Sequence, residues 1–81
     1  MNQMSDPIFL SIKTNPLWAA AVFSARAVDR GGVVRRAVRD VEREIGRAVF
    51  VAEVRRRGFH LVECGGQFVV ICNPGVLQLI C

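Results

Sequence analysis

The spacing of apolar residues predicts helices in the middle of the chain. The clearest signal covers residues 33–45, where apolar side chains recur three or four positions apart: Val34, Val38, Val41 and Ile45. Gly46 weakens this helix, and helical character resumes from Ala48 to Arg57, followed by Gly58 as a C-terminal cap. The pattern leaves open whether Val33 to Arg57 forms one kinked helix or two, because residues 49–51 also have strand propensity.

A second helix is predicted nearer the N-terminus. Asn15 suits the N-cap and Pro16 the first helical position, so an alanine-rich helix would run from Pro16 and stop at the glycines 31 and 32. A strand remains an alternative for Trp18–Val28, because polar and apolar residues alternate around Ser24.

The remaining apolar runs predict strands. Ile8–Lys13 reads as a short N-terminal strand, and residues 60–64 and 67–72 flank Gly65 and Gly66, a pair that suits a tight hairpin turn. Residues 73–75, Asn-Pro-Gly, turn the chain again into Val76–Cys81. The expected fold is therefore α+β, a single domain over residues 1–81, with two or three helices on a C-terminal three-stranded antiparallel meander.

Length and composition fit a small folded domain that binds a partner. The chain has 81 residues, of which 52% are hydrophobic and 22% charged, far from the composition of disordered chains. A domain of this size buries a limited share of its surface. Since Val76–Cys81 would form an edge strand without a charged side chain, we expect a homodimer or an exposed apolar edge.

Several classes of function are not expected from the motifs. The sequence contains no phosphate-binding glycine loop, metalloprotease motif or serine-hydrolase elbow. Cys64, Cys72 and Cys81 lack zinc-site spacing, and no acid is apparent beside His60 to orient it as a general base. We expect no enzymatic activity, metal or cofactor, no membrane segment, and a cytoplasmic protein with reduced thiols.

Arginine is the feature that points to a partner. Ten of the eleven basic residues are arginine and the net charge is +4; residues 30–57 hold nine arginines against four acids, a net +5. Such segregation favours binding of nucleic acid or an acidic protein surface, although a solvated helix face is the alternative. On a helix from residue 33, several of these arginines would lie opposite the apolar stripe. The candidate partner-binding residues are Arg35, Arg36, Arg39, Arg43, Arg47, Arg55, Arg56 and Arg57.

The segment Val54–Ile71, VRRRGFHLVECGGQFVVI, resembles the core of HicA-type toxins, small messenger-RNA-cleaving proteins with a double-stranded-RNA-binding-like fold. The family carries Gly-Ser-His at the turn, with histidine as the catalytic residue. The matching positions here are Gly65, Gly66 and Gln67, so the resemblance implies an RNA-binding module without nuclease activity.

In size and composition the whole chain resembles the anti-CRISPR proteins of phages and prophages. That resemblance implies a non-enzymatic inhibitor in the cytoplasm of a bacterial host, which binds a type I CRISPR effector complex through its arginines and blocks target-DNA binding. The HicA-like RNA-binding module is the second hypothesis, and a small transcriptional or structural dimer is the third.

Overall fold

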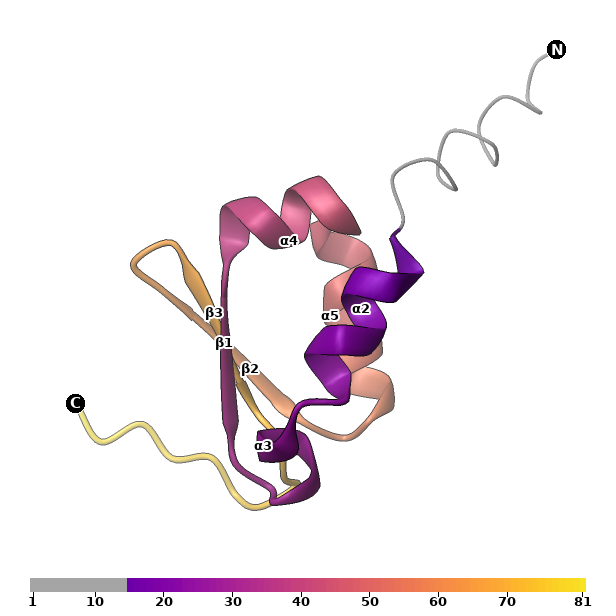
Figure 1. Cartoon of the computed structure of the whole chain (residues 1–81). Coiled ribbons are helices and arrows are strands. Elements are labelled where there is room, and N and C mark those ends of the chain that lie inside the picture. The colour runs from indigo at the N-terminus through magenta and orange to yellow at the C-terminus, as the bar shows by residue number, and fades with distance from the viewer. Residues whose placement is uncertain (1–14) are drawn as a thin grey trace, which may run out of the picture.

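The structure, a computed structural model, describes residues 15–81, and the strand expected at Ile8–Lys13 lies outside them. It contains helices and one antiparallel sheet, which confirms the α+β class (Figure 1). The elements in chain order are α2 (Pro16–Phe23), α3 (Arg26–Asp29), β1 (Val33–Ala37), α4 (Val38–Glu44), α5 (Arg47–Arg56), β2 (His60–Cys64) and β3 (Gln67–Ile71).

The sheet is built around the predicted hairpin. Gly65 and Gly66 join β2 to β3 with φ angles of +59° and +77°, which glycine adopts without the steric penalty of a side chain. The strand order is β1-β3-β2, so β3 is central and pairs with β1 on its other side. The hairpin prediction is confirmed.

Two strand and helix assignments from the sequence are wrong. Val33–Ala37 is a strand, and Val76–Cys81, expected to be the third strand, has no regular secondary structure. Val34 does face the core, but from β1, opposite Val70 of β3. The spacing of four residues between Val34 and Val38 suggested one helix, but Val34 belongs to a strand and Val38 to the helix that follows it. Because β1 occupies the side of β3 where a third strand of the hairpin would lie, Val76–Cys81 does not pair with β3.

The structure also resolves the two helix alternatives. Two helices, α4 and α5, follow β1, separated by Ile45 and Gly46. The N-terminal region is helical, but it breaks at Ser24 and Ala25 into α2 and α3. The predicted start is confirmed, since the Asn15 side chain accepts a hydrogen bond from the Trp18 N–H at 3.2 Å.

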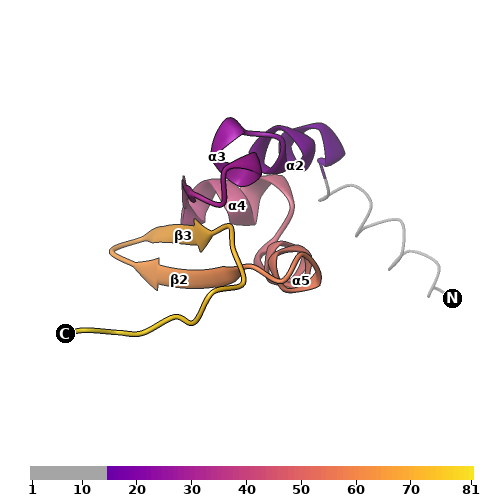
Figure 2. The ribbon, with the colours of Figure 1, turned by 90° about the horizontal axis from the view of Figure 1, so that it is seen from below.

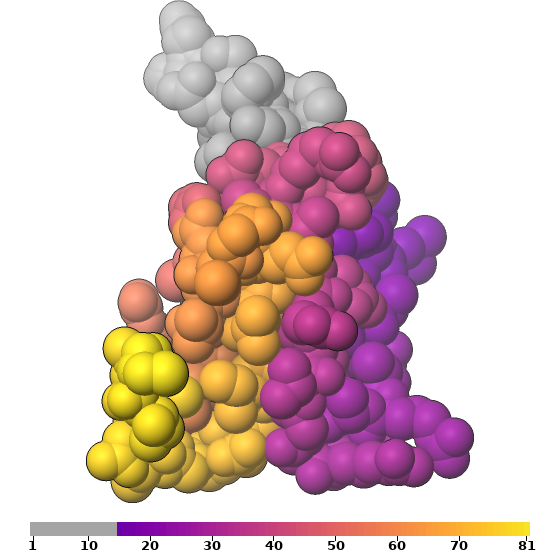
Figure 3. Space-filling model, turned by 90° about the vertical axis from the view of Figure 1, so that its left-hand side faces the viewer, coloured from indigo at the N-terminus to yellow at the C-terminus, as the bar shows by residue number. Residues whose placement is uncertain are grey.

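The helices within residues 15–81 lie on one face of the sheet and enclose one core (Figures 1 and 2). The buried residues are Val22, Phe23, Val34, Val41, Ile45, Phe50, Val54, Phe68, Val70 and Cys72. The opposite sheet face, seen in Figure 3, has no helix over it among the described residues. Within residues 15–81, none of the helices has the length and apolarity needed to cross a membrane.

Candidate nucleic-acid interface

Helices α4 and α5 form a helix-turn-helix unit whose turn depends on one glycine. Ile45 is the C-cap of α4 and Gly46 the N-cap of α5, and the N–H groups of both donate to the Val41 carbonyl, at 3.0 and 2.9 Å. Gly46 has a φ of +87°, and a Cβ there would meet nothing within 4 Å. The backbone conformation, rather than lack of space, thus favours glycine here. Figure 1 shows α4 running across the end of the sheet and α5 running back on the helical side of the sheet.

The C-terminal end of α5 is fixed by the predicted glycine cap. The Phe59 N–H donates to the Val54 carbonyl at 3.1 Å and the Gly58 N–H to the Arg55 carbonyl at 3.0 Å, with Gly58 at φ +75°. These two bonds define a Schellman motif, and the half-buried Phe59 packs against the core. The cap directs the chain straight from α5 into β2.

Helix α5 has a buried side and an open side. Phe50 and Val54 are buried in the core. Since successive residues are about 100° apart, Ala48 and Ala52 point the opposite way, and both are exposed. Arg55 lies on the flank of this alanine surface and is exposed too. The outward face of α5 is therefore small in side-chain volume, with a cation beside it.

The candidate arginines do not form one helix face, because the predicted helix does not exist in that form. Arg35 and Arg36 lie on β1, Arg39 and Arg43 on α4, and the other four on α5 or at its end. Arg35 projects from the outer face of the sheet, whereas the half-buried Arg36 shares the side of Phe68. The expectation of a continuous helical arc of arginines is wrong, although their role toward a partner stays a prediction.

Arg47 is exposed but binds residues of its own chain. Its guanidinium donates to both carboxylate oxygens of Glu63 on β2, at 2.9 and 3.3 Å, and to Glu42 at 3.4 Å. It also lies over the Phe68 ring, 5.0 Å from the centroid. The hydrogen bonds from Arg47 hold the pKa of Glu63 below its ordinary value. Arg47 thus links α5 to α4 and the hairpin.

Arg57 has a similar internal role at the other end of α5. Its guanidinium lies 4.4 Å from the centroid of the Phe23 ring and donates to Glu53 at 2.7 Å. Arg56 donates to the same carboxylate, and the hydrogen bonds from Arg56 and Arg57 lower the pKa of Glu53. Glu53 therefore pairs with two of the three arginines at this end of the helix.

The arginines of α4 are paired at the surface. Arg43 reaches Asp40 at 3.3 Å and Glu44 at 3.1 Å, and Arg39 reaches Asp40 at 3.5 Å. Glu44 also accepts a bond from the Asn15 amide, and that bond, followed by the one from Arg43, lowers the pKa of Glu44. Exposed ion pairs of this kind stabilise the fold little, and the arginine can exchange its carboxylate partner for another anion.

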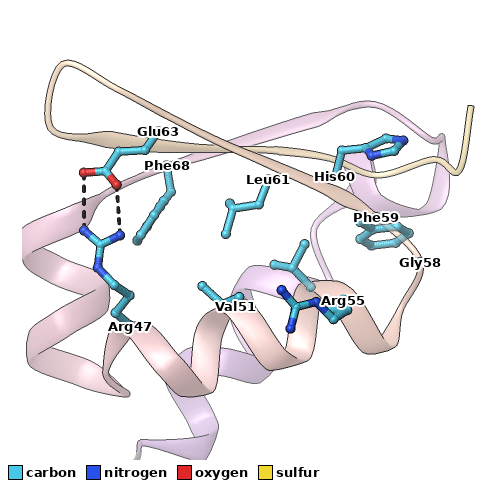
Figure 4. A pocket seen from close by; sticks show the side chains of 10 residues that line it. Arg47, Val51, Arg55, Gly58, Phe59, His60, Leu61, Glu63 and Phe68 are labelled. Carbon is cyan, nitrogen blue, oxygen red and sulfur yellow. Dashed lines mark hydrogen bonds and ion pairs between the residues drawn. The ribbon is translucent and has the colours of Figure 1, made fainter. Parts of the chain in front are cut away.

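Within residues 15–81, three of the eight candidates have no carboxylate within ion-pair distance: Arg35, Arg36 and Arg55. Of these, Arg55 belongs to the helix-turn-helix unit. It also lines a groove of about 510 Å³ between α5 and β2 (Figure 4). Arg47 and Glu63 close one end of the groove, Phe59 and His60 lie at the other, and Val51 and Leu61 line it between them.

The cysteines and the histidine do not assemble a reactive site in the described part of the chain. Cys72 is buried, and desolvation raises the pKa of its thiol, which disfavours the reactive thiolate. Cys64 and Cys81 are free and exposed. A His60 ring nitrogen contacts the Gly75 carbonyl at 2.5 Å. No group of three potential metal ligands occurs within residues 15–81.

The chain matches no family model, no curated protein and no solved structure.

The sequence analysis did not identify the helix-turn-helix unit. Its signal was present as two helical patterns separated by Gly46, with a capping glycine and a hairpin after the second. The unit was obscured because Val33–Ala37 was assigned to the first helix, which made that helix too long for such a motif.

Proposed function

We propose that this protein binds double-stranded DNA, with α5 entering the major groove and α4 lying across the phosphate backbone. The proposal develops the third hypothesis from the sequence, a small transcriptional protein. In helix-turn-helix proteins the second helix reads the groove while the first crosses the backbone. The proposal assigns those two positions to α5 and α4.

The single observation that carries the proposal is the open face of α5. The helix follows a short glycine-containing turn, as the second helix of a helix-turn-helix does, and its outward side chains are Ala48 and Ala52. Small side chains let a helix backbone approach a base-pair edge closely. Neither α4 nor the hairpin covers this face, because both pack against the opposite, buried side of α5.

The charge around α5 supports a polyanionic partner. Arg55 has no carboxylate partner among the described residues and flanks the alanine face. Arg39 and Arg43 lie on α4, exposed and held only by surface ion pairs, so phosphate oxygens can take over their guanidinium groups. The first N–H groups of α5 have no side-chain cap, which leaves donors near a phosphate approaching its N-terminus.

The test is a titration of the purified protein with a fluorescent DNA duplex of mixed sequence, at a series of salt concentrations. We expect binding that weakens steadily as salt rises, because each phosphate contact releases counterions and adds about 0.9 to the slope of log K against log salt. Absence of binding at low salt would overturn the proposal.

Two matched arginine variants locate the surface. Arg55→Ala should weaken binding and lower the salt slope by about one contact. Arg30→Ala removes another exposed arginine, at the end of α3 and outside the helix-turn-helix unit, and should leave affinity nearly unchanged. Equal losses in both variants would indicate non-specific attraction to the net charge, and would contradict docking through α5.

Competition separates this proposal from the other two hypotheses. Stronger binding to single-stranded or structured RNA than to duplex DNA would favour the HicA-like module. Binding to a type I CRISPR effector complex, with none to naked duplex DNA, would favour the inhibitor. Both hypotheses stay predictions, and the same protein preparation serves all three measurements.

A further inference from the structure

The segment Val76–Cys81, named the tail below, starts from a fixed point on the fold. The Cys72 N–H donates to the Gly32 carbonyl at 2.8 Å, and the Asn73 side chain donates to the Gly31 carbonyl at 3.0 Å. The contact between His60 and the Gly75 carbonyl places the start of the tail beside the first residue of β2. The direction in which the tail leaves the domain is therefore set by hydrogen bonds.

Beyond Gly75 the tail is extended, apolar and unpaired. Its large aliphatic side chains are 98% exposed at Val76, 51% at Leu77, 88% at Leu79 and 83% at Ile80. No backbone group in the described part of the chain pairs with it. It carries no charged side chain. Uncharged extended segments of this kind pair readily with other strands.

The sheet offers a matching edge. Strand β2 pairs only with β3, so its other side presents free N–H and C=O groups. The neighbouring outer face of the sheet includes Val33 and Val62, which are 53% and 37% exposed, and its single arginine or lysine is Arg35. Figure 3 shows the tail alongside this face.

We propose that two copies of the chain form a symmetric dimer in which the tail of each adds as a strand to the β2 edge of the other. Each copy contains one unpaired extended segment and two free sheet edges, at β1 and at β2. The tail starts beside His60 of β2, so a two-fold arrangement can pair each tail with the β2 edge of the other copy. Because the tail carries no charge and the outer sheet face a single arginine, two chains of net charge +4 can meet there with little repulsion.

The arrangement leaves the proposed DNA surface accessible. The tail leaves the domain on the side of the uncovered sheet face, whereas α5 lies on the helical side (Figure 1). Dimerisation and DNA binding can therefore be measured separately, and failure of one does not imply failure of the other.

The first test measures mass by light scattering of the full chain, with reductant present, over a range of concentrations. We expect a dimer for the natural sequence and a monomer for Leu77→Glu/Leu79→Glu. Leu17→Glu, which alters a leucine of α2 that is 81% exposed, is the matched control and should remain dimeric. Circular dichroism of each variant verifies that the domain is folded.

Three outcomes would overturn the proposal. A monomer at every concentration would mean that the tail remains unpaired or folds onto its own β2. A dimer that persists in the tail variant would place the interface elsewhere. A dimer that disappears on adding reductant would be a disulfide through Cys64 or Cys81.

Hydrogen exchange supplies the second, independent test. Strand addition predicts that the amides of Val76–Cys81 and of β2 gain protection together as concentration rises. A dimer whose tail amides exchange as fast as those of the monomer would contradict strand pairing.

Discussion

The two sides of helix α5 use arginine in opposite ways. On the buried side, Arg47 and Arg57 each lie over a core aromatic ring and bind a carboxylate of the same chain. On the open side, Arg55 flanks an alanine surface and has no ion-pair partner within residues 15–81. The first two are thus engaged in the fold, and the third is available to a ligand.

The comparison shows why a count of arginines does not define a binding surface. Arg55 and Arg57 are two residues apart in sequence, yet two steps of about 100° place them on different sides of the helix. Guanidinium groups stack on aromatic rings and bind carboxylates as readily as phosphates. Helix phase and the positions of Phe23 and Phe68 decide which of these interactions each arginine makes.

The largest effect is expected from the buried side. Phe50 is fully buried, with ring centroids 5.8 Å from Phe23 and 5.3 Å from Phe68. Phe50→Ala should lower the free energy of unfolding by about 3–5 kcal/mol, because it removes buried surface and leaves a cavity between two rings. Urea denaturation measures the loss. Val49→Ala, next to it but 44% exposed, is the control and should cost far less.

The second largest loss of stability is expected at Gly46, in the turn between α4 and α5. Gly46→Ala should cost about 1–3 kcal/mol, because the φ of +87° and ψ of 149° at this position form a backbone conformation that essentially only glycine adopts, although a side chain would have space. Gly46→Asn should cost a similar amount, since asparagine tolerates the left-handed helical region, with ψ of about +47°, and not this one. Equal stability of the alanine variant and the natural protein would show that the turn does not require positive φ.

Local signals in the sequence predicted the parts of the fold that depend on local chemistry. The Asn15 cap, the Gly58 cap and the Gly65-Gly66 turn are each set by residues close in the chain, and each was confirmed. The class of fold followed from these elements together.

The errors arose where distant residues decide the structure. Val33–Ala37 is a strand because it pairs with β3, from which it is separated by residues 38–66, and no local pattern reveals such a distant partner. The candidate site suffered in the same way. The sequence named eight candidate arginines, but which of them bind groups of the same chain depends on the positions of Glu63, Glu53 and two aromatic rings.

A smaller change in stability is expected when the ion pair between Arg47 and Glu63 is tested at acid pH. The pKa of Glu63 is lowered in the fold by Arg47, so the stabilisation from this pair is fully present above the ordinary glutamate pKa of about 4.3 and is lost as pH falls through the lower folded value. Arg47→Met retains an apolar cover on Phe68 but removes the charge. The variant should therefore lose less stability than the natural protein between neutral and acid pH.

Urea midpoints at a neutral and an acid pH measure this difference. Arg35→Met, which alters an arginine without an ion-pair partner in the described region, is the control and should show the natural pH dependence. Identical pH dependence in the Arg47 variant would mean that the pair with Glu63 does not contribute to folding.

The smallest effect on stability, and the sharpest on binding, is expected at Ala52. Its side chain is exposed at the centre of the open side of α5, so Ala52→Glu and Ala52→Arg should each change the free energy of unfolding by no more than about 0.5 kcal/mol. If this face meets DNA, both long side chains obstruct the close approach that Ala52 allows, but the glutamate also repels phosphates whereas the arginine attracts them. Ala52→Glu should therefore weaken binding at least tenfold, and Ala52→Arg should weaken it much less. A purely steric obstruction would weaken the two variants alike. A much larger loss for glutamate than for arginine at equal stability would show that the open side approaches a polyanion, and unchanged affinity in both would exclude this face from the DNA contact.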